Sequence, residues 1–183
     1  MGKIWFTSDL HFGHDKDFTY APRGFNSVQE HDKTILNNFN SIVAKEDDVY
    51  ILGDLMLGPN PEASLSYISK LNGHIHLIIG NHDTINKIQK YQEFCGINYI
   101  DYATMIKYKK YSFYLSHYPT LCANYDDYKK IWNLHGHTHS QEKFSEFAQC
   151  YNVALDAHNC FPIEIEDIIA DIRKKREEFN NEI

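Results

Sequence analysis

Short apolar runs recur along the chain and alternate with polar or helical stretches. We interpret these runs as β-strands because they are rich in β-branched, aromatic or leucine residues and are bounded by turn-forming residues. The predicted strands are Lys3–Thr7, Asp48–Leu52, His74–Ile79, Tyr111–Ser116, Ile131–Leu134 and Tyr151–Leu155. Two weaker runs, Tyr99–Tyr102 and Met105–Tyr108, are predicted to form an additional hairpin.

Helical patterns lie between the predicted strands. Ser27 and Glu30 have the spacing of a capping box and precede a helical apolar face. A second helix is predicted to begin at Asn60-Pro61 and to end before Gly73. A C-terminal amphipathic helix is predicted from isoleucines at helical spacing, namely Ile165, Ile168, Ile169 and Ile172. The early β–α–β alternation predicts an α/β layered fold, and the later strands predict a second, mixed sheet.

Length and composition favour one globular domain over residues 1–183. Hydrophobic residues make up 43% of the chain, which is typical of a folded protein and not of a disordered one. No segment approaches the roughly 18 consecutive apolar residues that a membrane span needs, and the N-terminus lacks a secretory pattern. We therefore expect a cytoplasmic protein. Its cysteines are scattered and are expected to be ordinary thiols.

The net charge of −7 argues against tight binding to long duplex nucleic acid, which depends on many phosphate contacts. It does not argue against a small phosphorylated substrate, because bound metal ions invert the local charge. The chain contains 11 histidines. Histidine is the commonest metal ligand, so a chain this rich in histidine is a candidate metal-binding protein.

Metal-binding residue types follow the ends of the predicted strands. They are Asp9 and His11, Asp54, the run Asn81-His82-Asp83, His117, and His137 and His139. One such residue alone would be read as a helix cap, a turn residue or a surface group. Their joint occurrence predicts a metal site, because strand ends converge at one edge in layered α/β folds.

The donor types indicate which ions fit. Carboxylate, imidazole and amide donors together favour manganese, iron, cobalt, nickel or zinc, whereas calcium prefers oxygen ligands alone. We expect two divalent transition-metal ions, with manganese first among them. Asp54 is the expected bridge, with one ion on each carboxylate oxygen. Two such ions hold a bridging hydroxide that serves as the nucleophile at neutral pH.

The motifs resemble those of the calcineurin-like metallophosphoesterases, and in particular small bacterial and phage-type members. The matching blocks are Asp9-x-His11, Gly53-Asp54, Gly80-Asn81-His82-Asp83, His117 and Gly136-His137-x-His139, in the order that the family has. The resemblance implies a four-layer αββα sandwich with two mixed β-sheets and a site at one edge of the sheets.

The resemblance also implies a role for each matching residue. The first ion would be held by Asp9, His11, Asp54 and His139, and the second by Asp54, Asn81, His117 and His137. His82 would protonate the leaving oxygen as a general acid, and Asp83 would orient it. The implied activity is that of a dinuclear metal-dependent phosphoesterase.

Two further residues are weaker candidates for substrate binding. His14 follows the first motif and is expected either to contact the substrate or to have a supporting or capping role. Arg23 lies between Pro22 and Gly24 and is expected to be exposed, as a phosphate clamp or as plain surface. We assign no function to His31, His74, His76, His135 and His158.

The leading hypothesis is a phosphodiesterase that hydrolyses a small nucleotide-like phosphoester. One alternative is a nuclease that acts on short single strands, although the net charge speaks against it. Another is a non-catalytic binding scaffold, similar to the family's retromer component, which intact His82 argues against. The sequence leaves open the physiological substrate, the preference for monoester or diester, and whether the protein forms a homodimer.

Overall fold

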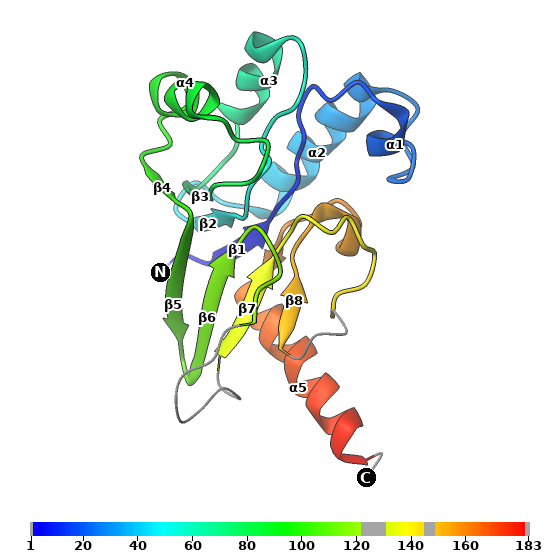
Figure 1. Ribbon diagram of the computed structural model, residues 1–183, viewed down its shortest axis with the longest axis vertical. Coiled ribbons are helices and arrows are strands. Elements are labelled where there is room, and N and C mark those ends of the chain that lie inside the picture. Colours follow the sequence, from blue (N-terminus) through cyan, green and yellow to red (C-terminus); the bar gives the residue numbers. More distant parts are fainter. Residues whose placement is uncertain (1, 122–130, 145–148, 182–183) are drawn as a thin grey trace.

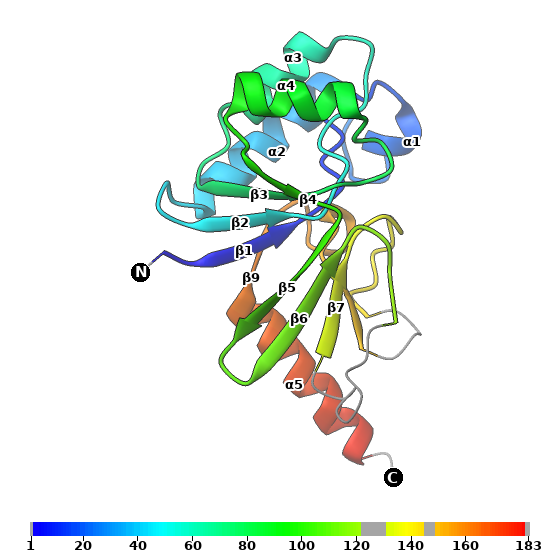
Figure 2. The same ribbon diagram turned by 60° about the vertical axis from the view of Figure 1, so that its left-hand side comes forward.

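The computed structural model describes residues 2–121, 131–144 and 149–181. It contains a first sheet with the strand order β4-β3-β2-β1-β9, in which β1 to β4 run parallel and β9 runs antiparallel (Figure 1, and Figure 2 for β9). The strands are β1 (Ile4–Thr7), β2 (Asp48–Ile51), β3 (His74–Ile78), β4 (Tyr99–Asp101) and β9 (Ile163–Glu164).

The second sheet has the strand order β5-β6-β7-β8. Its β5–β6 pair is antiparallel and its other pairs are parallel, so both sheets are mixed. The strands are β5 (Ala103–Tyr108), β6 (Tyr111–Ser116), β7 (Ile131–His135) and β8 (Cys150–Asn152). The predicted α/β class with two mixed sheets is therefore confirmed.

Helices α2, α3 and α4 cover the outer face of the first sheet (Figure 2). The predicted start signals form in large part, since Ser27 accepts from the backbone N–H of Glu30 and Asn60 accepts from that of Ala63. The capping box differs in its second half, because the Glu30 carboxylate accepts from the backbone N–H of Asn26, one residue before the cap. The helices are α1 (Asp17–Tyr20), α2 (Val28–Ile42), α3 (Pro61–Ile68), α4 (Ile85–Cys95) and α5 (Ile165–Asn181), with a 3-10 helix at Leu155–Ala157. None of these described helices has the length and apolar character that crossing a membrane requires.

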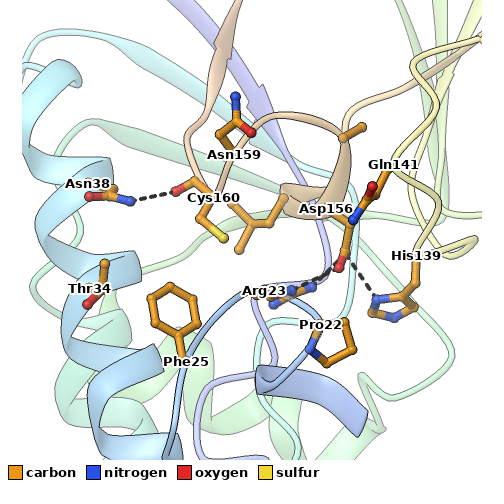
Figure 3. Close-up of a pocket in the computed structure, with 12 residues that line it drawn as sticks. Pro22, Arg23, Phe25, Thr34, Asn38, His139, Gln141, Asp156, Asn159 and Cys160 are labelled. Atoms are coloured by element: carbon orange, nitrogen blue, oxygen red, sulfur yellow. Dashed lines mark hydrogen bonds and ion pairs between the residues drawn. The ribbon is translucent and has the colours of Figure 1, made fainter.

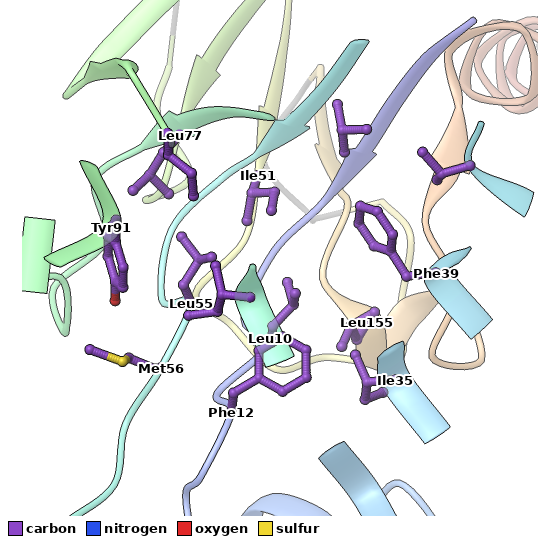
Figure 4. Packing of buried hydrophobic residues seen from close by; sticks show 14 of the residues in the cluster. Leu10, Phe12, Ile35, Phe39, Ile51, Leu55, Met56, Leu77, Tyr91 and Leu155 are labelled. Carbon is purple, nitrogen blue, oxygen red and sulfur yellow. The ribbon is translucent and has the colours of Figure 1, made fainter. Parts of the chain in front are cut away.

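The first sheet separates two apolar clusters. Successive residues of a strand point to opposite faces, so Trp5 packs under the helices whereas Phe6 faces the second sheet. Figure 4 shows the cluster under the helices, in which side chains of α2 and α4 meet those of the central strands. Burial on both faces explains why β1 and β2 read as nearly continuous apolar runs.

Helix α5 packs its predicted isoleucine face against the second sheet. Ile168 and Ile172 belong to the same cluster as Phe113 and Leu134 of that sheet and Phe6 of the first. The helix and the first sheet thus share the apolar face of the second sheet. Polar contacts anchor the helix on its outer side, where the Asp171 carboxylate accepts from the Tyr151 hydroxyl and the Lys143 ammonium.

Two strand predictions are wrong in part. The predicted hairpin does not form: β4 pairs with β3, and β5 pairs with β6 in the other sheet. Only Tyr102 separates β4 from β5, too little for a hairpin turn, so the chain crosses between the sheets there. The strand predicted to reach Leu155 ends at Asn152, because the Asn152 side chain accepts from the Ala154 backbone N–H and turns the chain into the 3-10 helix.

His158 gives the fold a measurable pH dependence. Burial lowers the pKa of its imidazole to about 4, and its Nε2 pairs with the Asn152 carbonyl at 2.8 Å. Between pH 6.5 and 4 the unfolded chain therefore binds a proton that the folded chain does not, and stability falls as the pH is lowered. We expect a loss of about 2 kcal/mol between pH 7 and pH 5 from this residue.

The measurement is urea unfolding of the metal-free protein at both pH values. His158→Gln should show a smaller loss than the wild type, by about that amount. Equal losses in the two proteins would show that the burial of His158 does not set the acid sensitivity.

Candidate metal centre

The loops that follow the predicted strand ends meet at one edge of the two sheets. Residues after β1, β2 and β3 come from the first sheet, and residues after β6 and β7 come from the second. All the candidate ligands lie in this one place: Asp9, His11, Asp54, Asn81, His117, His137 and His139. Their side chains form two groups of donor atoms.

The first group contains Asp9, His11 and His139. The Nε2 atoms of His11 and His139 are 3.2 Å apart. They lie 3.8 and 3.6 Å from Oδ1 of Asp9. Three lone-pair donors at these separations surround a space of the size that one ion would take.

The second group contains Asn81, His117 and His137. Oδ1 of Asn81 lies 2.8 Å from Nε2 of His117 and 3.0 Å from Nδ1 of His137. The two imidazole nitrogens are 3.2 Å apart. His117 is oriented by its other ring nitrogen, which is 2.7 Å from the backbone carbonyl of Leu52.

Asp54 lies between the two groups and is buried. Its Oδ2 is 3.9 Å from Nε2 of His11 and 3.5 Å from Nε2 of His117. The structure differs from the expectation that each oxygen serves one ion, because Oδ1 accepts the backbone N–H of His82 at 2.8 Å. A single carboxylate oxygen therefore faces both groups.

The donor set fits divalent cations. Oδ1 of Asp9 is fully buried and has no hydrogen-bond partner among the described residues, which is costly unless a cation compensates it. Burial lowers the pKa of His11 well below its ordinary value and raises that of Asp54. A neutral imidazole leaves its Nε2 lone pair available for a metal, as ligation requires.

Several candidate ligands occupy the left-handed backbone region, which non-glycine residues seldom adopt. Their φ angles are 58° for Asp9, 51° for His11, 60° for Asp54, 68° for His137 and 47° for His139. Each such residue costs on the order of 1 kcal/mol or more, and such residues cluster at functional sites. The surrounding contacts hold these loops in a conformation that aims the side chains at the centre.

Glycines next to the ligands allow the loops to approach one another. A Cβ atom on Gly53 would lie 2.7 Å from the Cα of Gly80. A Cβ on Gly80 would collide with the Asp54 carboxylate, and one on Gly136 would collide with the Ser8 hydroxyl and the Asp9 carboxylate. The glycines of the predicted motifs are thus required by close contact between loops from different strands.

His82 lies at the mouth of the centre, and Asp83 lies beneath it. The His82 side chain is 40% exposed, with Nε2 3.9 Å from Oδ2 of Asp54. The expectation that Asp83 orients His82 is wrong. The Asp83 carboxylate instead accepts from the backbone N–H groups of Asp54, Leu55 and Gly80 and from the Tyr91 hydroxyl, at 2.7 to 3.3 Å.

Two other side chains, those of Lys87 and His14, lie next to the same loops. The Lys87 ammonium donates to the backbone carbonyls of Met56 and His82, each at 2.7 Å. His14 lies beside the first group, with its ring centroid 5.7 Å from that of His11 and its Nδ1 2.8 Å from the Thr19 hydroxyl. His14 is therefore positioned next to the centre, as the substrate-contact hypothesis requires.

Arg23 is not exposed, contrary to expectation. Its side chain is 1% exposed, and its guanidinium donates to both carboxylate oxygens of Asp156 at 3.0 and 2.8 Å. It also donates to the backbone carbonyl of Asp9 at 2.8 Å. These contacts use the guanidinium N–H groups that Arg23 would need in order to bind a phosphate.

Asp156 was missed by the sequence reasoning, because residues 151–155 were read as one continuous strand. Its Oδ2 is 3.1 Å from Nδ1 of His139. Burial alone would raise the pKa of Asp156, but hydrogen bonds from His139 and Arg23 hold it well below its ordinary range. The hydrogen bond to Asp156 raises the pKa of His139. The available signal was an acidic residue directly after an apolar run, the same pattern that identified Asp9 and Asp54.

The family comparison agrees with this geometry. The chain belongs to the calcineurin-like phosphoesterase family, which it matches over residues 2–180. The family is metal-dependent, and the structure provides candidate ligands for a metal site.

Relatives include proteins from an archaeon and a phage. An uncharacterised protein of Methanocaldococcus jannaschii is 32% identical over 183 residues, covering 95% of this chain and 93% of that protein. The Gene 66 protein of Mycobacterium phage L5 is 32% identical over 164 residues, covering 76% of this chain and 79% of that protein. A solved structure of a protein of unknown function from Aquifex aeolicus has a TM-score of 0.70 at 23% identity, covering 93% and 99% of the two chains, and this likeness supports the fold.

Asp83 should matter for stability. Asp83→Ala leaves three backbone N–H groups and the Tyr91 hydroxyl without their partner, and we expect it to lower the free energy of unfolding of the metal-free protein by about 3 kcal/mol or more. Tyr91→Phe removes one of these hydrogen bonds and should cost about 1 kcal/mol. Urea unfolding measures both. An Asp83→Ala protein of wild-type stability that loses only turnover would support the original assignment of Asp83 to His82.

Proposed function

We propose that the protein is a dinuclear metal-dependent phosphodiesterase that hydrolyses small nucleotide-like phosphoesters. The observation that carries this proposal is the pair of donor groups that share Oδ2 of Asp54. A carboxylate between two such groups is the arrangement that a two-metal hydrolase needs. Manganese is the first ion to test, followed by iron, nickel, cobalt and zinc.

The first ion would be held by Asp9, His11, Asp54 and His139. The second would be held by Asp54, Asn81, His117 and His137. When bound, the two ions would lower the pKa of a water molecule and neutralise charge on the phosphoryl oxygens. The protein's carboxylates and neutral imidazoles leave the loaded centre net positive, which reconciles an acidic chain with an anionic substrate.

His82 would act as the general acid. Its ring is half-exposed at the mouth of the centre, and its backbone N–H is fixed to Oδ1 of Asp54. Lys87 holds the carbonyl of the same residue. Backbone anchoring on both sides keeps the imidazole near a bound phosphoryl group, where it can donate a proton to the leaving oxygen.

Two exposed aromatic side chains support a substrate with planar groups, and we call Phe18 and Tyr118 the aromatic rim. Phe18 is 74% exposed and packs edge-on against His14 with ring centroids 5.4 Å apart. Tyr118 is 50% exposed and lies 4.4 Å from the ring of His137. Tyr118 thus lies against a residue of the second donor group, whereas Phe18 is next to His14, which in turn lies beside His11 of the first group. Exposed rings of this kind can stack with a nucleobase or an aryl group.

The alternatives make different demands. A nuclease on short single strands would cleave oligonucleotides with strong salt dependence. A binding scaffold would need neither the candidate ligands nor His82, and this chain keeps all of them. The phosphodiesterase proposal accounts for the intact ligands and the aromatic rim together.

Hydrolysis of bis-p-nitrophenyl phosphate and p-nitrophenyl phosphate tests the activity, with metal-stripped protein and separate additions of Mn²⁺, Ni²⁺, Co²⁺, Zn²⁺ and Mg²⁺. We expect metal-restored turnover that is faster on the diester. His82→Ala should keep the metal content while turnover falls about 100-fold. Asp54→Ala should lose at least one ion.

His74→Ala is the matched control, since His74 is an exposed histidine at the start of β3 and should leave turnover unchanged. If no added metal restores turnover although the ions are shown to be bound, the result would favour the binding scaffold. Loss of metal from the His82→Ala protein would contradict the separation of ligand from acid.

The aromatic rim is tested by comparing bis-p-nitrophenyl phosphate with methyl p-nitrophenyl phosphate, which lacks the second ring. Tyr118→Leu should raise KM about 10-fold for the first substrate, because stacking contributes about 1–3 kcal/mol per ring. The methyl ester should be affected less. Tyr102→Leu changes another exposed tyrosine and serves as the control. Equal effects of Tyr118→Leu on both esters would remove the support for an aryl or nucleoside substrate.

A further inference from the structure

A partly buried hydrogen-bond network connects the first donor group to the loop between α1 and α2. Its centre is Arg23, whose guanidinium donates two hydrogen bonds to the Asp156 carboxylate (Figure 3). The same carboxylate pairs with Nδ1 of His139. The three residues line the wall of a pocket of about 560 Å³. The fork geometry matters, because a bidentate guanidinium fixes a carboxylate in orientation as well as in position.

The network continues from Arg23 to the backbone of the first motif. One nitrogen of the guanidinium donates to the Asp9 carbonyl at 2.8 Å. Another is 2.9 Å from Nε2 of His31, whose Nδ1 lies 2.8 Å from Asp32. Asp32 accepts the backbone N–H of Gly13 at 2.8 Å. The loop that carries Asp9 and His11 is therefore held at both ends by groups connected to Arg23.

The second donor group is oriented differently. His117 pairs through Nδ1 with the neutral backbone carbonyl of Leu52. His139 pairs through Nδ1 with a carboxylate that itself carries a buried arginine partner. A carboxylate behind a metal-ligating histidine fixes the ring tautomer and raises the basicity of the ligating nitrogen, and its loss typically weakens metal binding 10- to 100-fold.

We propose that Asp156 and Arg23 are positioning residues for the first ion. Asp156 accepts the Nδ1–H of His139, which turns the Nε2 lone pair towards Oδ1 of Asp9. Arg23 holds Asp156 and the Asp9 backbone at once. It thereby keeps the two ligands Asp9 and His139 in position relative to each other, although they are far apart in the chain. The inference rests on the proposed function, since it takes the donor groups to bind ions.

Calorimetric titration of Mn²⁺ into the metal-stripped full-length protein tests the inference. The wild type should bind two ions. Asp156→Asn keeps the side-chain size but removes the charge. It should weaken the binding of one ion 10- to 100-fold, while the affinity for the other ion changes less than about 3-fold. Arg23→Lys keeps the charge but loses the two-pronged guanidinium contact, and should weaken the binding of the same ion by a smaller factor.

Asp171→Asn is the matched control, because Asp171 also accepts from a cation and a hydroxyl but touches no donor atom. It should bind both ions as the wild type does. Circular dichroism checks the fold of each variant, and Arg23→Lys carries the test if Asp156→Asn does not fold.

The outcomes separate the two proposals. A wild-type protein that binds no ion would overturn the proposed function. Two ions bound with wild-type affinity by Asp156→Asn would overturn the positioning role and leave the proposed function intact. Equal weakening of both ions would also overturn the positioning role, because it would show a general effect on the fold.

Discussion

The buried carboxylates of Asp9 and Asp54 lie so close together that they repel one another unless positive charge sits between them. Buried carboxylate oxygens and imidazole lone pairs are separated by 3.2 to 3.9 Å in the first group and its link to Asp54. Two uncompensated carboxylates within 4.8 Å of each other in a buried site repel by several kcal/mol. The rest of the fold must hold these atoms in place, and this requirement explains the loops, the glycines and the buried networks that surround the centre.

The fold meets this requirement with backbone contacts more than with long side chains. Asp83 ties the loop after β2 to the loop after β3, so the Asp54 carboxylate and the Asn81 loop cannot shift independently. Gly80 and Gly136 let neighbouring loops touch where a side chain would collide. The candidate ligands in left-handed conformations then project inward. The consequence is a preorganised donor set, in which little rearrangement remains for ion binding.

Sequence reasoning was most reliable where the signal was local. The strands, the helix caps and the ligands at strand ends all follow from residues close together in the chain, and the structure brings those ligands to one place. It failed where a contact joins distant segments. Arg23 and Asp156 are 133 residues apart, so nothing near Arg23 indicates that it is buried. The partners of Asp83 and the separation of β4 from β5 likewise depend on tertiary packing, which local patterns do not contain.

The Arg23–Asp156 pair also has a consequence for the order of events during biosynthesis. Asp9 and Arg23 leave the ribosome well before Asp156, which follows Arg23 by 133 residues and therefore on the order of 10 s later at ordinary rates of translation. Until then the nascent chain carries a half-built centre, with an arginine and acidic side chains that lack their permanent neighbours. The network behind the first donor group therefore forms only after both His139 and Asp156 have been synthesised.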